Sequence, residues 1–535
     1  SKEVFVCCLI VSLRCVFWAA PSIRGGGIDS PRPASQRAAA LILTAALLTG
    51  AAFPAFAGTY YIEEGDITIS AGTVAGTNKV EQGGTLKSEN DKDTVITNQK
   101  TDTASSHTVT IDAGKDKVEV TLKDVNIDTS SRNNAAVSVT GSGNTTIKLD
   151  GDNHLTGGIS DNGSYGLSGI SSSGSLTISG GETDSLTAQG GSGTDGSGGR
   201  GIFSKDLTIS GGTVNANGGD GKNGSGGSGI TSLGSLTISG GTVNAAGGDG
   251  TNSSDGGDGI TNNRGVTISS GGTVTAKGGS GEDGSGGRGI SSFGGVTISS
   301  GGTVTATGGN STGSDGSGGD GISSTSTTIS GGTVTADGGS GNFSGGNGIR
   351  SFDVAISGGT VNVAGGNGGN GSGSDVGNGI YSSDIDLSGS LELTVKAGSP
   401  NGKALSQRGN ELDLDDIKDK LGPGAKVTAI NANGDSKQVS IPRPVEPEEP
   451  VIPGDSSSSS GGGSADASVQ ESVFPGLVVT DKDGQRISYT STQSGNTLTV
   501  CVGRFTASLR ASLAALRQLR AEGIETITFQ TILCS

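Results

Sequence analysis

Two arginines stand in the same local context and could recognise an anionic or hydroxylated ligand. Arg200 and Arg288 each follow Gly-Ser-Gly-Gly and precede Gly-Ile, three repeat units apart. A guanidinium group can hold the carboxylate of an acidic sugar through two parallel hydrogen bonds. The interpretation that we prefer is a solvated turn arginine that was copied together with its repeat.

Cleavage of an acidic polysaccharide would need more than an arginine. Lyase chemistry uses a base beside a group of carboxylates that holds Ca²⁺ against the sugar. No repeat carries a dense set of Asp and Glu on one strand, and the two histidines, His107 and His154, belong to no metal-spaced or Ser-His-Asp arrangement. We therefore expect no catalytic residues, and a lyase-like enzyme ranks third among the functions considered.

Two aspartates are candidates for calcium binding. Asp195 and Asp283 each complete a G-G-x-G-x-D segment, the first part of a calcium-binding nonapeptide. That motif works as an unbroken tandem with an apolar residue two places after the Asp, where this chain has Ser197 and Ser285. Flexible glycine loops are the default interpretation. A looser site of stacked carboxylates stays open, because further aspartates fall in the equivalent loops: Asp220, Asp249, Asp255, Asp258, Asp315 and Asp320.

Aromatic side chains, on which sugar rings commonly stack, are scarce at 3% of the chain. Phe203 and Tyr381 directly follow a Gly-Ile dipeptide and are expected to point outward, so both are binding candidates. Phe293 and Phe352 lie two residues further along their own units. Alternatively, these rings fill gaps between a coil and its loop.

A repeat of about 30 residues must position all of these side chains. Each unit carries Gly-Ile, then Leu/Val-Thr-Ile-Ser, then Thr-Val-x-Ala, and the alternation of apolar and small polar residues is typical of strands with one buried face. The Gly211-Gly212 pair predicts a corner where glycine adopts positive φ. A unit this short cannot bury its own apolar row, so the units must stack. The sequence predicts an all-β fold, a right-handed parallel β-helix with three short strands per coil.

One outward pattern is regular enough to form a grid of hydroxyl groups. Three successive units carry T-x-T pairs: Thr273 and Thr275, Thr303 and Thr305, Thr333 and Thr335. Stacked coils lie about 4.8 Å apart, a spacing that would make the pairs a flat array. Ice-binding solenoids use such arrays, but the preference of β-branched residues for exposed strands is the explanation that we favour.

Composition and the first residues indicate export. The formal net charge of −17 argues against a nucleic-acid partner. Residues 1–57 are expected to be a leader, with Arg37 before the apolar run Ala38–Leu48 and cleavage after Ala57. The run is too short for a transmembrane helix, so no membrane anchor is expected. Ser1 is not a Met, and about the first 30 residues read as upstream read-through or as part of an unusually long leader. Alternatively, Val4–Ala20 is itself a first apolar signal.

Six segments are expected along the chain. After the leader come atypical N-terminal coils (58–157), in which Ile67–Ser70 with Gly72–Val74 reads as a degenerate first copy of the later unit. Regular glycine-rich repeats fill 158–398, and the end of the solenoid (399–441) includes a short helix around Leu412–Leu421. A linker rich in Pro, Glu, Ser and Gly follows at 442–468.

The last segment, 469–535, predicts a small α/β module. Strands are expected at Leu477–Thr480, Thr497–Val502 and Ile524–Thr531, with a helix that places Leu509, Leu513, Leu516 and Leu519 on one face. Cys501 and Cys534 could form a disulfide in an oxidising compartment.

Three stretches carry a family resemblance. They are V-E-V-T-L-K-D-V-N-I (118–127), T-T-I-K-L-D-G-D-N-H-L-T (145–156) and the recurring G-I-x-S…L-T-I-S-G-G-T-V-N-A. Over about residues 60–398 the chain resembles bacterial carbohydrate-binding β-helix domains, which are similar to pectate-lyase solenoids in fold and lack lyase activity. The resemblance implies secretion, attachment to polysaccharide and calcium-assisted acidic sites. This chain departs from it by carrying Gly and Ser where acidic residues would be wanted.

The leading expectation is a secreted or surface-exposed, monomeric, non-catalytic protein that binds polysaccharide, acidic polysaccharides included. Calcium is the one cofactor considered. The alternative is an adhesin-like stalk whose repeats act as a rigid spacer.

Overall fold

The computed structural model describes residues 57–369 and 377–443, together with short segments between 477 and 531. The chain divides into two compact units, residues 1–445 and 446–535. We call the first unit the solenoid and the second the C-terminal unit. The expected leader up to residue 56, nearly all of the linker, and Cys534 lie outside the described residues.

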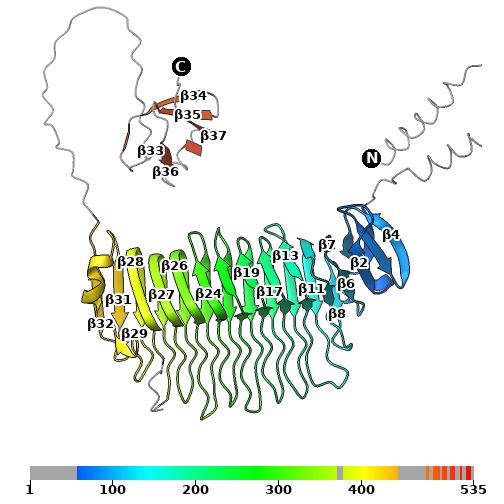
Figure 1. Ribbon diagram of the computed structural model, residues 1–535, viewed down its shortest axis with the longest axis horizontal. Coiled ribbons are helices and arrows are strands. Elements are labelled where there is room, and N and C mark those ends of the chain that lie inside the picture. The colour runs from blue at the N-terminus through cyan, green and yellow to red at the C-terminus, as the bar shows by residue number, and fades with distance from the viewer. Residues whose placement is uncertain are drawn as a thin grey trace, which may run out of the picture. The chain divides into compact units, whose positions relative to one another are not determined.

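The solenoid is a β-helix of about 12 turns with parallel strands, as predicted (Figure 1). Strands that begin at Gly-Ile and their equivalents form ladder 1: β2 (Ile67–Ala71), β6 (Val109–Asp112), β9 (Val137–Thr140), β12 (Ile170–Ser172), β15 (Ile202–Ser204), β18 (Ile230–Ser232), β21 (Ile260–Asn262), β24 (Ile290–Ile298), β26 (Ile322–Asp337), β27 (Ile349–Ala364), β28 (Ile380–Lys396) and β29 (Leu405–Gln407).

The other two apolar segments of the repeat form two further ladders. Strand β24 continues around the corner from ladder 1 into ladder 2, and β26 to β28 continue through ladder 2 into ladder 3. Ladder 2 also contains β1 (Thr59–Tyr61), β5 (Val95–Thr97), β7 (Lys117–Lys123), β10 (Asn144–Asp150), β13 (Ser175–Ser179), β16 (Asp206–Ile209), β19 (Ser235–Ile238) and β22 (Gly265–Ile268). Ladder 3 contains β8 (Asn126–Asp128), β11 (Asp152–Thr156), β14 (Ser185–Gln189), β17 (Thr213–Asn217), β20 (Thr242–Ala246), β23 (Thr273–Lys277), β25 (Thr303–Thr307) and β31 (Lys426–Ile430).

Each ladder contributes a row of apolar side chains to the interior of the coils. In one coil the buried residues are Ile202, Leu207, Ile209, Val214 and Ala216. They pair in register with Ile230, Leu236, Ile238, Val243 and Ala245 of the next coil. Burial of each larger aliphatic side chain contributes about 1.5–3 kcal/mol, so the stacked rows are the main source of stability. The predicted corner is also confirmed, since Gly212 has φ of +77°.

The N-terminal end corrects one sequence assignment. Ile67 pairs with Val109, and that strand pairs with β9 and so leads into the Gly-Ile ladder. Ile67–Ser70 is therefore not a copy of the Leu-Thr-Ile-Ser strand, although the two share their residue pattern. β3 (Asn78–Gln82) pairs antiparallel with β2, and β4 (Thr85–Asp91) pairs antiparallel with β3. η1 (Ile62–Glu64) follows β1. Val74, assigned to a third strand, lies in a turn and is 51% exposed.

At the other end the last coils are covered by short elements. β30 (Asn410–Glu411) pairs antiparallel with β29, and β32 (Ser436–Ser440) with β31. Between them the predicted helix is present as the 3₁₀ helix η2 (Leu414–Lys420), which buries Leu414 and Ile417 against the core.

The described segments of the C-terminal unit form two small sheets. β33 (Leu477–Thr480) pairs with β36 (Ser508–Ala511), and β35 (Thr497–Val502) lies between β34 (Thr490–Ser494) and β37 (Thr526–Thr531). The predicted strands are confirmed, but Leu509 belongs to β36 and not to the helix that its spacing predicted. Cys501 lies in β35, and the expected disulfide with Cys534 stays a prediction.

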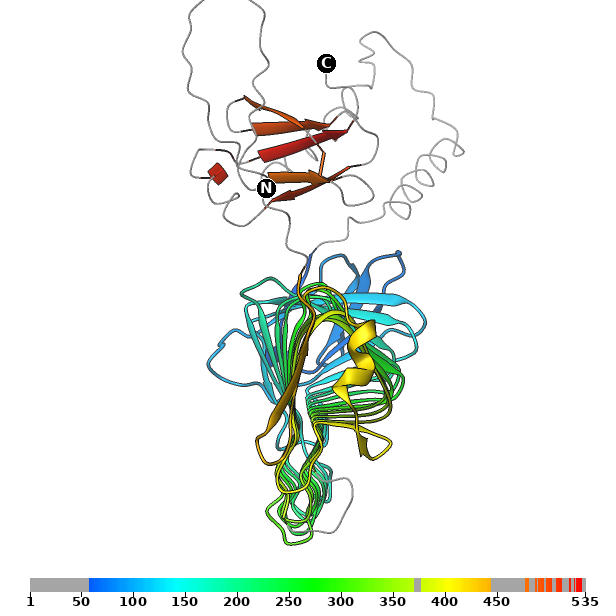
Figure 2. The same ribbon diagram turned by 90° about the vertical axis from the view of Figure 1, so that its left-hand side faces the viewer.

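The glycine-rich segments between coils are ordered and tightly packed. Each segment leaves ladder 3 along a first leg and returns to ladder 1 along a second leg, and the stacked segments form a narrow extension beside the coils (Figure 2). Gly-Gly pairs on both legs face each other across this extension, which we call the glycine slab. It comprises Gly190–Gly191, Gly198–Gly199 and the equivalent pairs up to Gly365–Gly366.

Backbone hydrogen bonds link the two legs along the whole slab. The amide of Gly227 donates to the carbonyl of Gly219 at 2.8 Å, and the amide of Gly248 on the next coil donates to the carbonyl of Gly227 at 2.9 Å. The same zigzag runs without a break from Gly191 to Gly366. Interpreting these segments as flexible loops is therefore wrong, because their backbone donors and acceptors are paired.

A methyl group on a slab glycine should disrupt the packing. A Cβ atom on Gly227 would approach the carbonyl oxygen of Gly199 closer than 3.0 Å, a separation that Cβ atoms essentially never show. We expect Gly227→Ala to destabilise the solenoid by about 2–3 kcal/mol in denaturant unfolding. The control is Gly265→Ala in β22, where the nearest atom would be 3.5 Å away. Equal stability of the two variants would contradict tight packing of the slab.

Candidate functional site

A polar hollow of about 340 Å³ runs along the second legs of four successive coils. We call it the trough. Its floor is made of slab glycines, and polar side chains rise on either side: Asp255, Asp258, Ser285, Arg288, Ser317, Asp320, Ser344, Asn347 and Arg350. The hollow therefore has a floor of backbone between two polar walls. The trough lies parallel to the axis of the solenoid, since its members come from equivalent positions of consecutive coils.

The wall next to ladder 1 is a chain of hydrogen bonds between coils. The carboxylate of Asp258 accepts from the Arg288 amide at 2.7 Å. Asp320 accepts from the amide and the side chain of Asn347 at 2.8 and 2.9 Å, and Asn347 accepts from both groups of Asn378 in turn. Each of these Asp and Asn side-chain oxygens thus fixes the next coil in register with its own.

Asp258 is a half-buried carboxylate of this wall. Removal from water raises its pKa above the ordinary value of 3.8, against the opposing effects of the Arg288 amide and guanidinium and of the Thr261 hydroxyl, which donates to Oδ2 at 3.1 Å. Desolvation therefore outweighs the favourable contacts, and the charged form of Asp258 costs stability at neutral pH.

The predicted arginines do not form one site. Arg288 lies in the trough, where its Nε is 3.9 Å from Oδ2 of the nearly buried Asp320. Arg200 is three coils away and packs over the ring of Phe203, with its guanidinium carbon 5.3 Å from the ring centroid. Burial lowers the pKa of Arg200. Sequence reasoning missed Arg350, which lines the trough and lies over the ring of Tyr381 at 5.9 Å.

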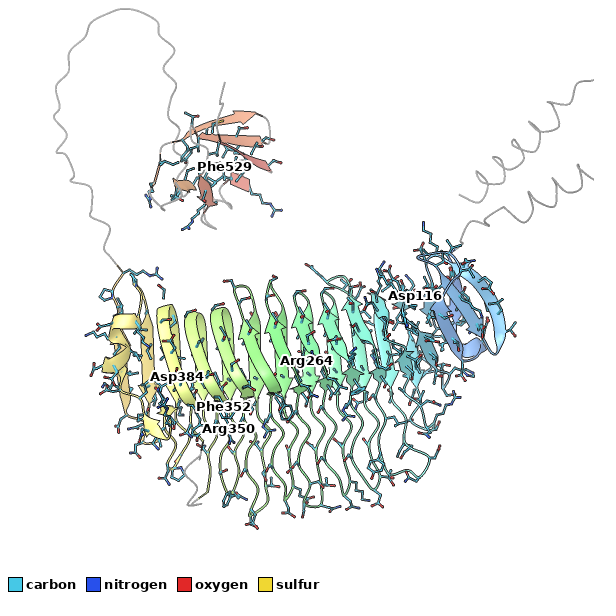
Figure 3. All side chains as sticks on the ribbon, in the orientation of Figure 1. Asp116, Arg264, Arg350, Phe352, Asp384 and Phe529 are labelled. Carbon is cyan, nitrogen blue, oxygen red and sulfur yellow. The ribbon has the colours of Figure 1, made fainter. Side chains whose placement is uncertain are left out.

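Phe203 and Tyr381 are half-buried residues of ladder 1, each paired with an arginine. Among the residues that the structure describes, the most exposed rings are Phe293 and Phe352, which are 76% and 66% exposed and lie at the corner between ladders 1 and 2. Figure 3 shows Phe352 beside Arg350 on the surface of the coils. These two rings do not fill gaps between coil and loop.

The calcium candidates lie on separate coils at the tips of their segments. Asp195 accepts a hydrogen bond from the Asn223 side chain at 2.7 Å, and Asp283 is exposed. Several other loop aspartates accept backbone hydrogen bonds from the next coil; Asp220, for example, accepts from the amide of Asp249 at 2.9 Å. Within the described part of the chain, no group of three or more His, Cys, Asp or Glu side chains could hold a metal ion.

Two other surfaces of the solenoid are regular or hollowed. The T-x-T pairs stack in register on ladder 3, with Thr273 beside Thr303 and Thr303 beside Thr333. A larger hollow of about 570 Å³ lies between the turn after β2 and residues 116–119. Its Lys117 and Glu119 pair with each other, and it lies on the atypical coils, so no repeat extends it along the axis.

No family model, curated protein or solved structure matches the chain. In the part of the chain that the structure describes, no helix combines the length and the apolar character needed to span a bilayer.

Neutralising Asp258 should stabilise the protein at neutral pH. A raised carboxyl pKa in the folded state means that stability is lost as the pH rises through that pKa and is regained as the pH falls towards 3.8. We expect Asp258→Asn, whose amide oxygen can still accept from Arg288, to raise the melting temperature at pH 7 by about 1–2 °C. The gain should vanish near pH 4.

The matched control for this measurement is Asp283→Asn, which changes an exposed carboxylate at a segment tip. It should leave the melting temperature unchanged at both pH values. A lower melting temperature of Asp258→Asn at pH 7 would show that attraction to Arg288 exceeds the cost of burying the charge.

Proposed function

We propose that this protein is exported and binds polysaccharide without cleaving it, through the trough on the side of the solenoid. The observation that carries the proposal is the combination of donors and acceptors along this hollow. Guanidinium groups of Arg288 and Arg350 offer hydrogen-bond donors, while carboxylates, hydroxyls and the Asn347 amide offer acceptors or both. Sugar hydroxyls both donate and accept, so this lining suits a hydroxylated chain.

The charges of the trough favour a neutral polysaccharide. Three aspartates and two arginines line it, so the local balance is negative, as is the whole chain at −17. A polyanion would meet repulsion from both. The proposed ligand is therefore a neutral glycan lying along the axis, where equivalent contacts recur at each coil.

The arrangement of the carboxylates supports binding over catalysis. Asp255, Asp258 and Asp320 each accept hydrogen bonds from backbone amides of the following coil. Groups held in this way are poorly suited to bind an ion or to move a proton. The proposal therefore assigns these carboxylates to holding successive coils together and not to lyase chemistry.

A rigid spacer is the second candidate. It is favoured by the unbroken hydrogen-bond zigzag of the glycine slab, which stiffens the solenoid along its axis. Such a stalk would need no polysaccharide, and the absence of binding to any glycan would leave it as the better explanation.

Removing one guanidinium from the trough should weaken glycan binding. We expect Arg350→Gln to lower the affinity for a soluble neutral polysaccharide about fivefold, the loss of roughly one charge-assisted hydrogen bond. Isothermal titration against hydroxyethyl cellulose, a mixed-linkage glucan and polygalacturonate, each with and without EDTA, measures this effect. The control is Arg264→Gln, an exposed arginine that does not line the trough.

Two results would contradict the proposal in different ways. Binding of polygalacturonate alone, abolished by EDTA, would indicate a calcium-dependent acidic ligand. Equal affinities of the Arg350 and Arg264 variants would place the binding surface outside the trough.

A further inference from the structure

One row of exposed residues follows the corner between ladders 1 and 2. Each member comes three places after the isoleucine of Gly-Ile, directly after residues that pair in register from coil to coil. On five successive coils the row, which we call the corner ridge, comprises Leu233, Asn263, Phe293, Thr325 and Phe352. All five side chains are exposed, the three apolar ones by 44%, 76% and 66% in chain order.

Along the ridge, apolar and polar residues alternate from one coil to the next. Leu233, Phe293 and Phe352 lie on every second coil, and Asn263 and Thr325 lie on the coils between them. Consecutive strands of a sheet are about 4.8 Å apart, so neighbouring apolar side chains of the ridge are about 9.6 Å apart along the axis. The ridge is thus a periodic surface parallel to the solenoid.

The backbone beneath the ridge is held by hydrogen bonds to neighbouring coils. The Leu233 amide donates to the Ser204 carbonyl at 3.0 Å. The Phe293 carbonyl accepts from the Thr325 hydroxyl at 2.6 Å, and the Phe352 carbonyl accepts from the Ser382 hydroxyl at 2.8 Å. Rings on such a fixed backbone lose little conformational freedom when a ligand covers them.

The alternation decides which kind of partner fits. Protein interfaces have a continuous apolar centre with a polar rim, whereas here a side chain that forms hydrogen bonds separates each apolar group from the next. A linear polysaccharide presents the same alternation, because the C–H faces of its sugar rings are apolar and its hydroxyl groups are polar. Aromatic side chains offer a flat apolar face for such rings.

We propose that the corner ridge is a stacking surface for a linear polysaccharide, in which alternate sugar rings rest on Leu233, Phe293 and Phe352. This inference rests on the proposed function and adds a second contact surface to it. Asn263 and Thr325 hydrogen-bond to hydroxyl groups of the intervening sugars. The ridge selects extended chains in which every second ring presents the same face, and it discriminates against glycans that wind.

The test uses the full chain and removes the two rings. Phe293→Ala combined with Phe352→Ala should lower the affinity for hydroxyethyl cellulose about tenfold, and each single variant about threefold. The losses for a coiled β-1,3-glucan should be smaller. Phe293→Tyr, which keeps the aromatic face, should bind like the unchanged protein. The control is Phe343→Ala, since Phe343 is 47% exposed but lies in a glycine-rich segment away from the ridge.

The outcomes separate this inference from the proposed function. If the unchanged protein binds no polysaccharide, both fail. If Arg350→Gln weakens binding while the double phenylalanine variant binds normally and melts at the same temperature, the ridge proposal alone is overturned. If the double variant changes only the oligomeric state in analytical ultracentrifugation, the ridge joins copies of this chain, and its assignment to polysaccharide is likewise overturned.

Discussion

The close approach of two backbone layers in the glycine slab is the constraint on which the rest of the solenoid depends. Gly219 and Gly227 hydrogen-bond across the slab, and Gly227 accepts from the following coil. A side chain on these glycines would collide with a carbonyl oxygen of a neighbouring leg. The layers can therefore stack only where glycine recurs on both legs, and this requirement fixes the height of each coil outside the β-helix as firmly as the apolar rows fix it inside.

Because the slab sets the register, short polar side chains beside it can bridge coils. An Asp or Asn oxygen reaches the backbone amide of the equivalent residue one coil further, as Asp258 and Asn347 do. The trough follows from the same geometry, since slab glycines form its floor and their polar neighbours on the second legs form its walls. Its carboxylates accept hydrogen bonds from amides of the next coil. The guanidinium and hydroxyl groups are therefore the ones left to contact the proposed ligand.

The sequence could predict the interior of the solenoid better than its glycine-rich side. Ile202, Leu207 and Val214 alternate with polar residues, and burial in a strand is the only arrangement that covers such rows. The same signal misled at Ile67–Ser70, because residue pattern specifies a buried strand but not which of three ladders it joins. At Leu509 the helical spacing of leucines was outweighed by pairing of that segment with β33.

The structure of the glycine-rich segments was harder to predict from the sequence. A high glycine content indicates a flexible backbone, but it does not show how closely neighbouring segments pack. The spacing of the Gly-Gly pairs on both sides of each tip held the missing information, since an obligatory pair on every leg indicates contact more than flexibility. Likewise the aspartates suggested calcium, because a single sequence does not show whether a carboxylate faces an ion or the amide of the next coil. Arg350 was missed because no second unit repeats it at that position.

The ridge and the trough depend on the same periodicity, and this bears on how a protein so poor in aromatic residues could hold a polymer. One ring or one guanidinium contributes little affinity, but equivalent contacts at a fixed spacing act together once the first is made, because the rest of the chain is already near its partners. That gain requires a support whose spacing does not drift over several coils. The slab hydrogen bonds and the apolar rows provide such a support. The proposed polysaccharide binding would therefore depend on the same stiffness that a rigid spacer would use.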